Sequence, residues 1–215
     1  MAKKVLMTGF EPFGGDQVNP ALEAIRQLDG KTVEGVQIVV QKVPTVFYES
    51  VQTAIEAIEH HQPDVVICVG QAGGRTQITP ERVAINVDDA RIPDNKQQQP
   101  VDTPVAAGGP AAYWSTLPIK SIVRRLRDAG IPSSVSNSAG TFVCNHLFYG
   151  VMHYLDKNAK SIPAGFIHIP YIPSQTVFNQ APSLSLDLIV KALETAAVIS
   201  ANQTEDIVDV GGALH

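Results

Sequence analysis

The sequence predicts an α/β fold, a three-layer α/β/α sandwich around a mostly parallel mixed sheet. Short apolar runs alternate with amphipathic runs almost from end to end, which is typical of strands joined by helices. One run, residues 64–70, is apolar on both faces, as a central parallel strand covered by helices must be. The length of 215 residues suits one domain, 1–215, because α/β folds of this size are commonly a single unit.

The individual elements follow from apolar periodicity and from Gly and Pro punctuation. Buried strands are expected at residues 4–8, 36–43, 64–70, 133–136 and 165–169, with a short one at 82–86. Helices are expected from the Asn19-Pro20 cap onward and at residues 46–61, 119–129, 143–155 and 184–200. Residues 94–110 are rich in Pro, Gln and Gly and are expected to be an exposed loop or a hairpin tip, long enough to suggest function or mobility. The tail, 203–215, is expected to be weakly structured.

Composition argues against several classes of protein. A net charge of −5 with no basic patch disfavours nucleic-acid binding, which needs Lys and Arg to neutralise phosphates. No stretch of about 20 apolar residues is present, so no membrane-spanning helix is expected. The first apolar run is too short for a signal peptide, and two cysteines cannot build a disulfide framework. A reducing, cytoplasmic location is therefore expected.

Cys144 is the first candidate for chemistry. A predicted strand ends near Ser136, small residues with Gly140 make a tight turn, and an amphipathic helix starts around Cys144. A thiol at a helix N-terminus is expected to have a lowered pKa, and the unpaired backbone N–H groups there can hold an oxyanion. The alternative is a buried structural cysteine, which is the interpretation of Cys68 in the middle of an apolar strand.

Two histidines compete as the base for this thiol. His168 lies at the end of an apolar strand, where a polar imidazole must find a partner or face a cleft. His168 could be the base for Cys144 or a core histidine that is hydrogen-bonded to backbone groups, and the local sequence does not choose between these two roles. His146 is two residues after Cys144, so in a helix its side chain points away from the thiol.

A third residue must orient the histidine. The carboxylate candidates are Glu81, Asp88, Asp89, Asp94 and Glu11. Spacing does not choose among them, and a surface Glu81 paired with Arg82 or Arg91 is the plainer interpretation of its local sequence.

Two glycine-rich turns follow predicted strands, at residues 9–15 and 70–75. Neither matches the dinucleotide fingerprint or the P-loop, which makes nucleotide binding a weak hypothesis. The Cys144-Asn145-His146 run lacks the paired ligands of a structural zinc site, so no metal is expected. Phe10 and Phe13, in a loop beside glycines, are suited to wall a flat, uncharged ligand ring.

Several segments together resemble the pyroglutamyl peptidase I (pyrrolidone-carboxylate peptidase) family. They are residues 9–15 with Asn19-Pro20, 81–86 running into 88–94, 138–145 and 166–171. The match runs in order from about residue 4 to about residue 200. The resemblance implies a cysteine peptidase that removes an N-terminal pyroglutamyl residue from peptides. It implies Cys144, His168 and Glu81 as the catalytic residues, which chooses Glu81 over the aspartates.

The resemblance also carries expectations about assembly and pocket. It implies a phosphorylase/hydrolase-like sandwich that forms a homotetramer, acts on peptides with N-terminal pyroglutamate, and uses no metal or organic cofactor. Expected pocket residues are Phe10, Phe13 and Phe142, with Asn19 and Gln71 close by and Arg91 assisting the oxyanion. Ala21 departs from the family pattern, where Ser is common, and should cost only a local hydrogen bond.

Two alternatives stay open. A nucleoside-phosphorylase-like enzyme on a similar sandwich would need a phosphate site, and the glycine-rich turns offer only Arg75. A non-catalytic peptide-binding protein with the same fold predicts an unreactive Cys144.

Overall fold

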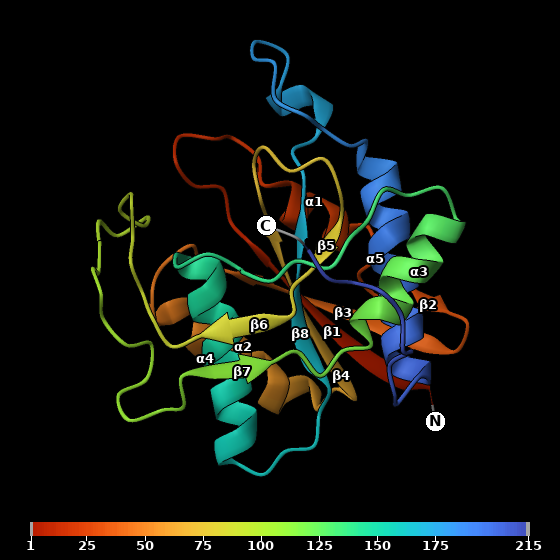
Figure 1. The fold of residues 1–215 in the computed structure, drawn as a ribbon, viewed down its shortest axis with the longest axis horizontal. Coiled ribbons are helices and arrows are strands. Elements are labelled where there is room, and N and C mark those ends of the chain that lie inside the picture. Colours follow the sequence, from red (N-terminus) through yellow and green to blue (C-terminus); the bar gives the residue numbers. More distant parts are fainter. Residues whose placement is uncertain (1, 214–215) are drawn as a thin grey trace.

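The computed structural model describes residues 2–213, and in this part of the chain one six-stranded sheet forms the centre (Figure 1). Its strands are β1 (Lys3–Phe10), β2 (Thr32–Val33), β3 (Val36–Val43), β4 (Val65–Gln71), β5 (Thr79–Pro80) and β8 (Ala164–Ile169). The order is β2-β3-β1-β4-β8-β5, and the edge strands β2 and β5 are antiparallel to otherwise parallel neighbours. A separate antiparallel pair joins β6 (Val83–Ile85) and β7 (Ala112–Trp114).

Helices cover both faces of the sheet, which confirms the predicted three-layer sandwich. They are α1 (Pro20–Arg26), α2 (Glu49–His61), α3 (Ile119–Asp128), α4 (Val143–Lys157), α5 (Leu186–Asn202) and a short 3₁₀ helix, η1 (Pro173–Gln175). Helices α1, α3 and α5 pack on one face, and α2 and α4 on the other (Figure 1). Strand β4 serves both layers, because its side chains alternate between the two apolar clusters.

Most predicted elements lie within three residues of their expected ends, but the strand predicted at 133–136 is wrong. That segment runs beside β5 and makes only isolated bridges, Ile78 to Ser133 and Glu81 to Ser136. Backbone bonds are present on both sides of Pro80, from Ser134 N to Ile78 O and from Ser136 N to Pro80 O. Pro80 has no N–H to donate, so the ladder is broken in its middle.

The loop at residues 94–110 contains neither helix nor strand, as predicted, but its first residue is firmly held. Asp94 is buried, and its carboxylate accepts backbone N–H bonds from Phe47, Lys96 and Gln98. The start of the loop is therefore attached to the segment that leads into α2.

The C-terminal tail also contains no helix or strand from residue 203 to 213, yet it makes specific contacts. Asp206 accepts backbone N–H bonds from Lys120 and Ser121, at the start of α3. Gly211 O accepts a bond from Arg82 Nη2. The last two residues of the predicted tail, like residue 1, lie outside the described residues. No helix in residues 2–213 is long and apolar enough to cross a membrane.

Candidate active site

The site is built where β4 and β8 end side by side. His168 of β8 pairs with Gly70 of β4 on one side and with Thr79 of β5 on the other. Directly opposed residues project to the same face of a sheet. A Cβ placed on Gly70 would lie only 3.0 Å from Cys144 Sγ, so the thiol occupies the space that the missing side chain leaves. The geometry therefore brings Cys144 and His168 together on the α4 face of the sheet.

Cys144 is the second residue of α4, as the turn-then-helix pattern predicted. The preceding turn uses Gly140 at φ +78°, a left-handed conformation that favours glycine. Phe142 occupies the N-cap position and provides no side-chain cap. The backbone N–H groups of the first turn therefore stay free of a side-chain acceptor beside the thiol.

The predicted lowering of the thiol pKa is wrong for the free protein. Burial raises the pKa of Cys144 to about 12, the negative charge of Glu81 acts in the same direction, and Arg75 opposes them. The thiol therefore stays protonated until a base removes its proton. Cys68 is a buried core residue, as expected, and burial raises its pKa to about 12 as well.

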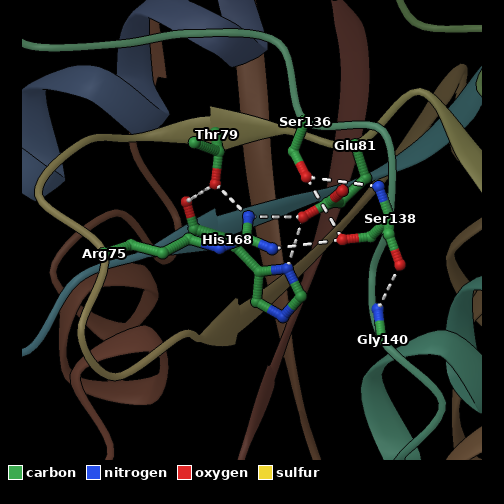
Figure 2. Close-up of polar contacts among 7 residues, drawn as sticks. All are labelled: Arg75, Thr79, Glu81, Ser136, Ser138, Gly140 and His168. Atoms are coloured by element: carbon green, nitrogen blue, oxygen red, sulfur yellow. Dashed lines mark hydrogen bonds and ion pairs between the residues drawn. The ribbon is translucent and has the colours of Figure 1, made fainter. Parts of the chain in front are cut away.

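His168 and Glu81 form a buried pair (Figure 2). His168 Nδ1 lies 2.7 Å from Glu81 Oε1, with the two side chains 4% and 0% exposed. Burial lowers the pKa of His168 more than Glu81 raises it, so the ring is neutral at neutral pH. Burial raises the pKa of Glu81, but His168, the Ser136 side chain and the charge of Arg75 together lower it by more, so this pKa lies below its usual value. Nδ1–H therefore donates to a charged carboxylate, which leaves Nε2 with its lone pair.

The structure distinguishes the carboxylates that spacing left open. Glu81 is fully buried, so the alternative of a surface residue paired with Arg82 or Arg91 is wrong. Its second partner is instead Arg75, whose Nη1 lies 2.7 Å from Oε1.

The other acidic candidates have other partners. Asp88 Oδ2 lies 2.8 Å from Nδ1 of His146, which confirms that this second histidine turns away from the thiol. Glu11 accepts bonds from Thr45 and Asn95. None of these contacts involves His168.

Of the three phenylalanines expected in the pocket, Phe10 lies in the core, whereas Phe13 and Phe142 face each other. Phe10 is 2% exposed, is the last residue of β1 and packs against Phe166, so the expectation of a loop position is wrong for this ring. Phe13 and Phe142 are partly exposed, with ring centroids 6.2 Å apart, and Phe47 supports Phe142 from the core at 5.5 Å. Phe13 and Phe142 therefore offer apolar surface near the start of α4.

The polar pocket candidates have varied surroundings. Asn19 caps α1 by accepting from Ala21 N and donates to Glu11 O. Gln71 ends β4, and its Oε1 accepts a 2.8 Å bond from Gln175 Nε2. Arg91 is exposed and makes no hydrogen bond or ion pair within residues 2–213.

Sequence reasoning missed Arg75 as part of this site. It considered Arg75 only as a phosphate ligand in a glycine-rich turn, whereas the guanidinium reaches Glu81 (Figure 2). A cation six residues before a buried acid was the one available signal. Within residues 2–213, no group of three or more His, Cys, Asp or Glu side chains is placed to hold a metal ion.

The family described as pyroglutamyl peptidase matches residues 3–203. The chain belongs to this family. It is 61% identical over 214 residues to the pyrrolidone-carboxylate peptidase of Bacillus licheniformis, with all of both chains covered. It is 55% identical over 215 residues to the enzyme of the same name from Bacillus subtilis, again over the full length of both. Family membership makes the chain a cysteine-type hydrolase of the pyroglutamyl peptidase class, which confirms the resemblance.

Solved structures agree with the fold. The pyroglutamyl peptidase I of Bacillus amyloliquefaciens superposes with a TM-score of 0.96 at 58% identity, covering 98% of this chain and 100% of that one. A mutant pyrrolidone carboxyl peptidase from Pyrococcus furiosus gives a TM-score of 0.89 at 40% identity, covering 92% and 97%. The sandwich is thus the fold of the family.

Proposed function

We propose that this protein hydrolyses the bond after an N-terminal pyroglutamyl residue, with Cys144 as nucleophile, His168 as base and Glu81 as the residue that orients the base. The observation that carries the proposal is the buried Glu81–His168 pair, in which His168 Nε2 has no partner among residues 2–213, beside a thiol seated over Gly70. Family membership supplies the substrate class.

The acylation step uses a neutral thiol and a neutral imidazole. His168 Nε2 takes the Cys144 proton as sulfur attacks the carbonyl carbon that joins the pyroglutamyl ring to residue two. Negative charge develops on the carbonyl oxygen, and uncapped N–H groups at the start of α4 can hold it. When the C–N bond breaks, the imidazolium returns its proton to the leaving amine, and a thioester remains on Cys144.

Deacylation reverses these roles with water. His168 takes a proton from water as the oxygen attacks the thioester, and the proton then goes to the departing Cys144 sulfur. Free pyroglutamate leaves and the thiol is restored. Glu81 stays ionised throughout, because its pKa lies below its usual value, and it compensates the charge of the imidazolium in both steps.

The pocket must accept a lactam that has no free amine and no side-chain charge. The facing rings of Phe13 and Phe142 supply apolar walls for such a ring. Phe10 is a core ring against Phe166, and we assign it to the pocket on the family resemblance alone. We assign Asn19 and Gln71 to its polar edge, and Arg91 to the developing oxyanion, on the family resemblance. An aminopeptidase that grips an ammonium group would need a free carboxylate there instead.

Release of a fluorogenic amide from its pyroglutamyl conjugate tests the proposal. We expect release by the wild type, loss of release on alkylation and in Cys144→Ala, and retained release in Cys68→Ala, the matched control from the core. Release that persists in Cys144→Ala would overturn the mechanism. A wild type that leaves the amide intact but phosphorolyses a nucleoside would replace the function with that of the rival enzyme.

We propose further that the protein works in the cytoplasm as a homotetramer. The family resemblance supports the assembly, and the exposed apolar side chains of Trp114, Val177 and Phe178 are of the kind that subunit interfaces cover. A thiol nucleophile also requires reducing conditions. Light scattering at assay concentration and cell fractionation test these two points, and a monomer or an exported protein would contradict them.

A further inference from the structure

Arg75 lies in the turn after β4 and contacts two neighbouring segments with one guanidinium group (Figure 2). Nη1 lies 2.7 Å from Glu81 Oε1 and 2.6 Å from Thr79 Oγ1. Nη2 lies 3.1 Å from Ser138 O. The planar, permanently charged fork of arginine suits this set of divergent acceptors.

Each contacted segment leads to a different member of the proposed catalytic set. Thr79 pairs with His168 across β5 and β8, and its Oγ1 lies 3.4 Å from His168 O. Ser138 belongs to the turn that enters α4 at Cys144, where its Oγ accepts the Gly140 N–H. Arg75 thus ties together the segments that carry Glu81, His168 and Cys144.

Glu81 shows how close this coupling is. Its Oε1 accepts from both Arg75 Nη1 and His168 Nδ1, each at 2.7 Å, whereas Oε2 is buried without a donor in residues 2–213. The orientation of the carboxylate therefore depends on the Arg75 guanidinium and the His168 N–H, which both donate to the same oxygen. If Arg75 is removed, the buried carboxylate keeps only the His168 N–H and the side chain of Ser136 as partners.

We propose that Arg75 is a positioning residue: it fixes the Glu81 carboxylate for His168 and keeps His168 in the unprotonated form that accepts the thiol proton. The proposal rests on the proposed function of the same site. The groups that face His168 are Glu81 after β5, Arg75 after β4 and Cys144 of α4. Of these, Glu81 raises the pKa of His168 and Arg75 lowers it. Loss of Arg75 therefore removes one of the two effects that oppose Glu81, leaving burial as the other, and should raise the pKa of His168.

The test compares Arg75→Ala and Arg75→Lys with wild type, using kcat/KM for a pyroglutamyl amide as a function of pH. In Arg75→Ala we expect kcat/KM to fall by about 10²-fold, as for a misplaced catalytic group, and the acid limb to move to higher pH. Added guanidinium should restore part of this activity. Arg75→Lys keeps a charge without the fork, so it should keep the wild-type acid limb with a lower kcat.

Arg82→Met is the matched control. Arg82 adjoins Glu81 in the chain but bonds to Asn137 and Gly211, so its loss should leave the acid limb unchanged. An Arg75→Ala enzyme with the wild-type acid limb, or one whose loss guanidinium does not relieve, would overturn the inference while wild-type activity keeps the proposed function intact. An inactive wild type would overturn both.

Discussion

Residues 2–213 contain two buried histidine–carboxylate pairs, and the pairs differ in what contacts the far nitrogen of each ring. In both, Nδ1 meets a carboxylate oxygen, at 2.7 Å for His168–Glu81 and 2.8 Å for His146–Asp88. Nε2 of His146 accepts the backbone N–H of Tyr48 at 2.8 Å. Nε2 of His168 has no such partner in residues 2–213 and lies on the face that holds the thiol.

This difference separates a structural pair from a reactive one. His146 uses both ring nitrogens and packs edge-on against Phe47 and Tyr48, so it joins α4 to the start of α2. Its tautomer is fixed, because a ring nitrogen that accepts an N–H must be unprotonated. Distance to a carboxylate alone therefore does not identify a catalytic histidine. A free second nitrogen beside a nucleophile does.

The largest effect should come from removing each ring in turn. His168→Ala should lower kcat/KM by about 10⁴-fold, at the upper end for loss of a general base, because the thiol is not ionised without it. His146→Ala should instead lower the free energy of unfolding by about 3 kcal/mol, since Asp88 and the Tyr48 N–H lose their partner. Steady-state kinetics and urea unfolding measure the two quantities. If the activity loss falls on His146, the comparison is reversed.

Replacing the two carboxylates should likewise affect activity at Glu81 and stability at Asp88, but by smaller amounts than replacing the histidines. Glu81→Gln removes the charge that compensates the imidazolium, and we expect kcat/KM to fall by about 10²-fold. Asp88→Asn keeps an acceptor for His146 Nδ1 and should cost only about 1 kcal/mol of stability. Equal activity losses in the two variants would show that both pairs act on the reaction.

The space beside His168 gives a third test. A Cβ on Gly70 would lie 2.7 Å from Phe166 Cζ and 3.0 Å from Cys144 Sγ. Gly70→Ala should therefore cost about 2 kcal/mol by overpacking and lower kcat about 10-fold by moving the thiol. Gly9→Ala is the matched control, because its Cβ would meet Ile25 of α1 at 2.7 Å. It should lose stability with no change in kcat, and a parallel loss of kcat would contradict the steric explanation.

The smallest expected effect concerns the pH at which kcat/KM falls on the acid side of its pH profile. Burial, opposed by Glu81, leaves the pKa of His168 below its usual value of 6.5. The ring must be unprotonated to act, so the acid limb of kcat/KM should be centred below pH 6.5, where activity falls as pH drops through the lowered pKa. The measurement is a pH profile of kcat/KM for the wild type. An acid limb centred above 6.5 would contradict a neutral His168.

Much of the fold could be predicted from local pattern. The strand expected at 36–43 coincides with β3, and the helix expected from Ile119 begins there, because long apolar repeats leave few alternatives. Strands β5 and β7 have two and three residues and exist only through partners far along the chain, such as His168 for Thr79. Strands of two or three residues are too short to show the alternation of apolar and polar residues by which a strand is recognised in a sequence.

The candidate site divides in a similar way. Cys144 follows from its turn-and-helix context, whereas the choice of Glu81 needed the family resemblance. Arg75 could not be found, because its partners are 4, 6 and 63 residues away and only folding brings them together. The direction of the pKa shift of Cys144 was predicted wrongly for a related reason. The helix end is visible in the sequence, but the burial that raises this pKa comes from tertiary packing.

The C-terminal tail has a consequence for the order of folding. The N-cap residue of helix α3 is Pro118, which provides no side-chain cap, and Asp206 supplies the missing acceptors from 85 and 86 residues further along the chain. During synthesis the N-terminal parts of a protein emerge and fold first. The start of α3 therefore stays uncapped until Asp206 has been synthesised and has reached it, so completion of that helix is a late step in folding.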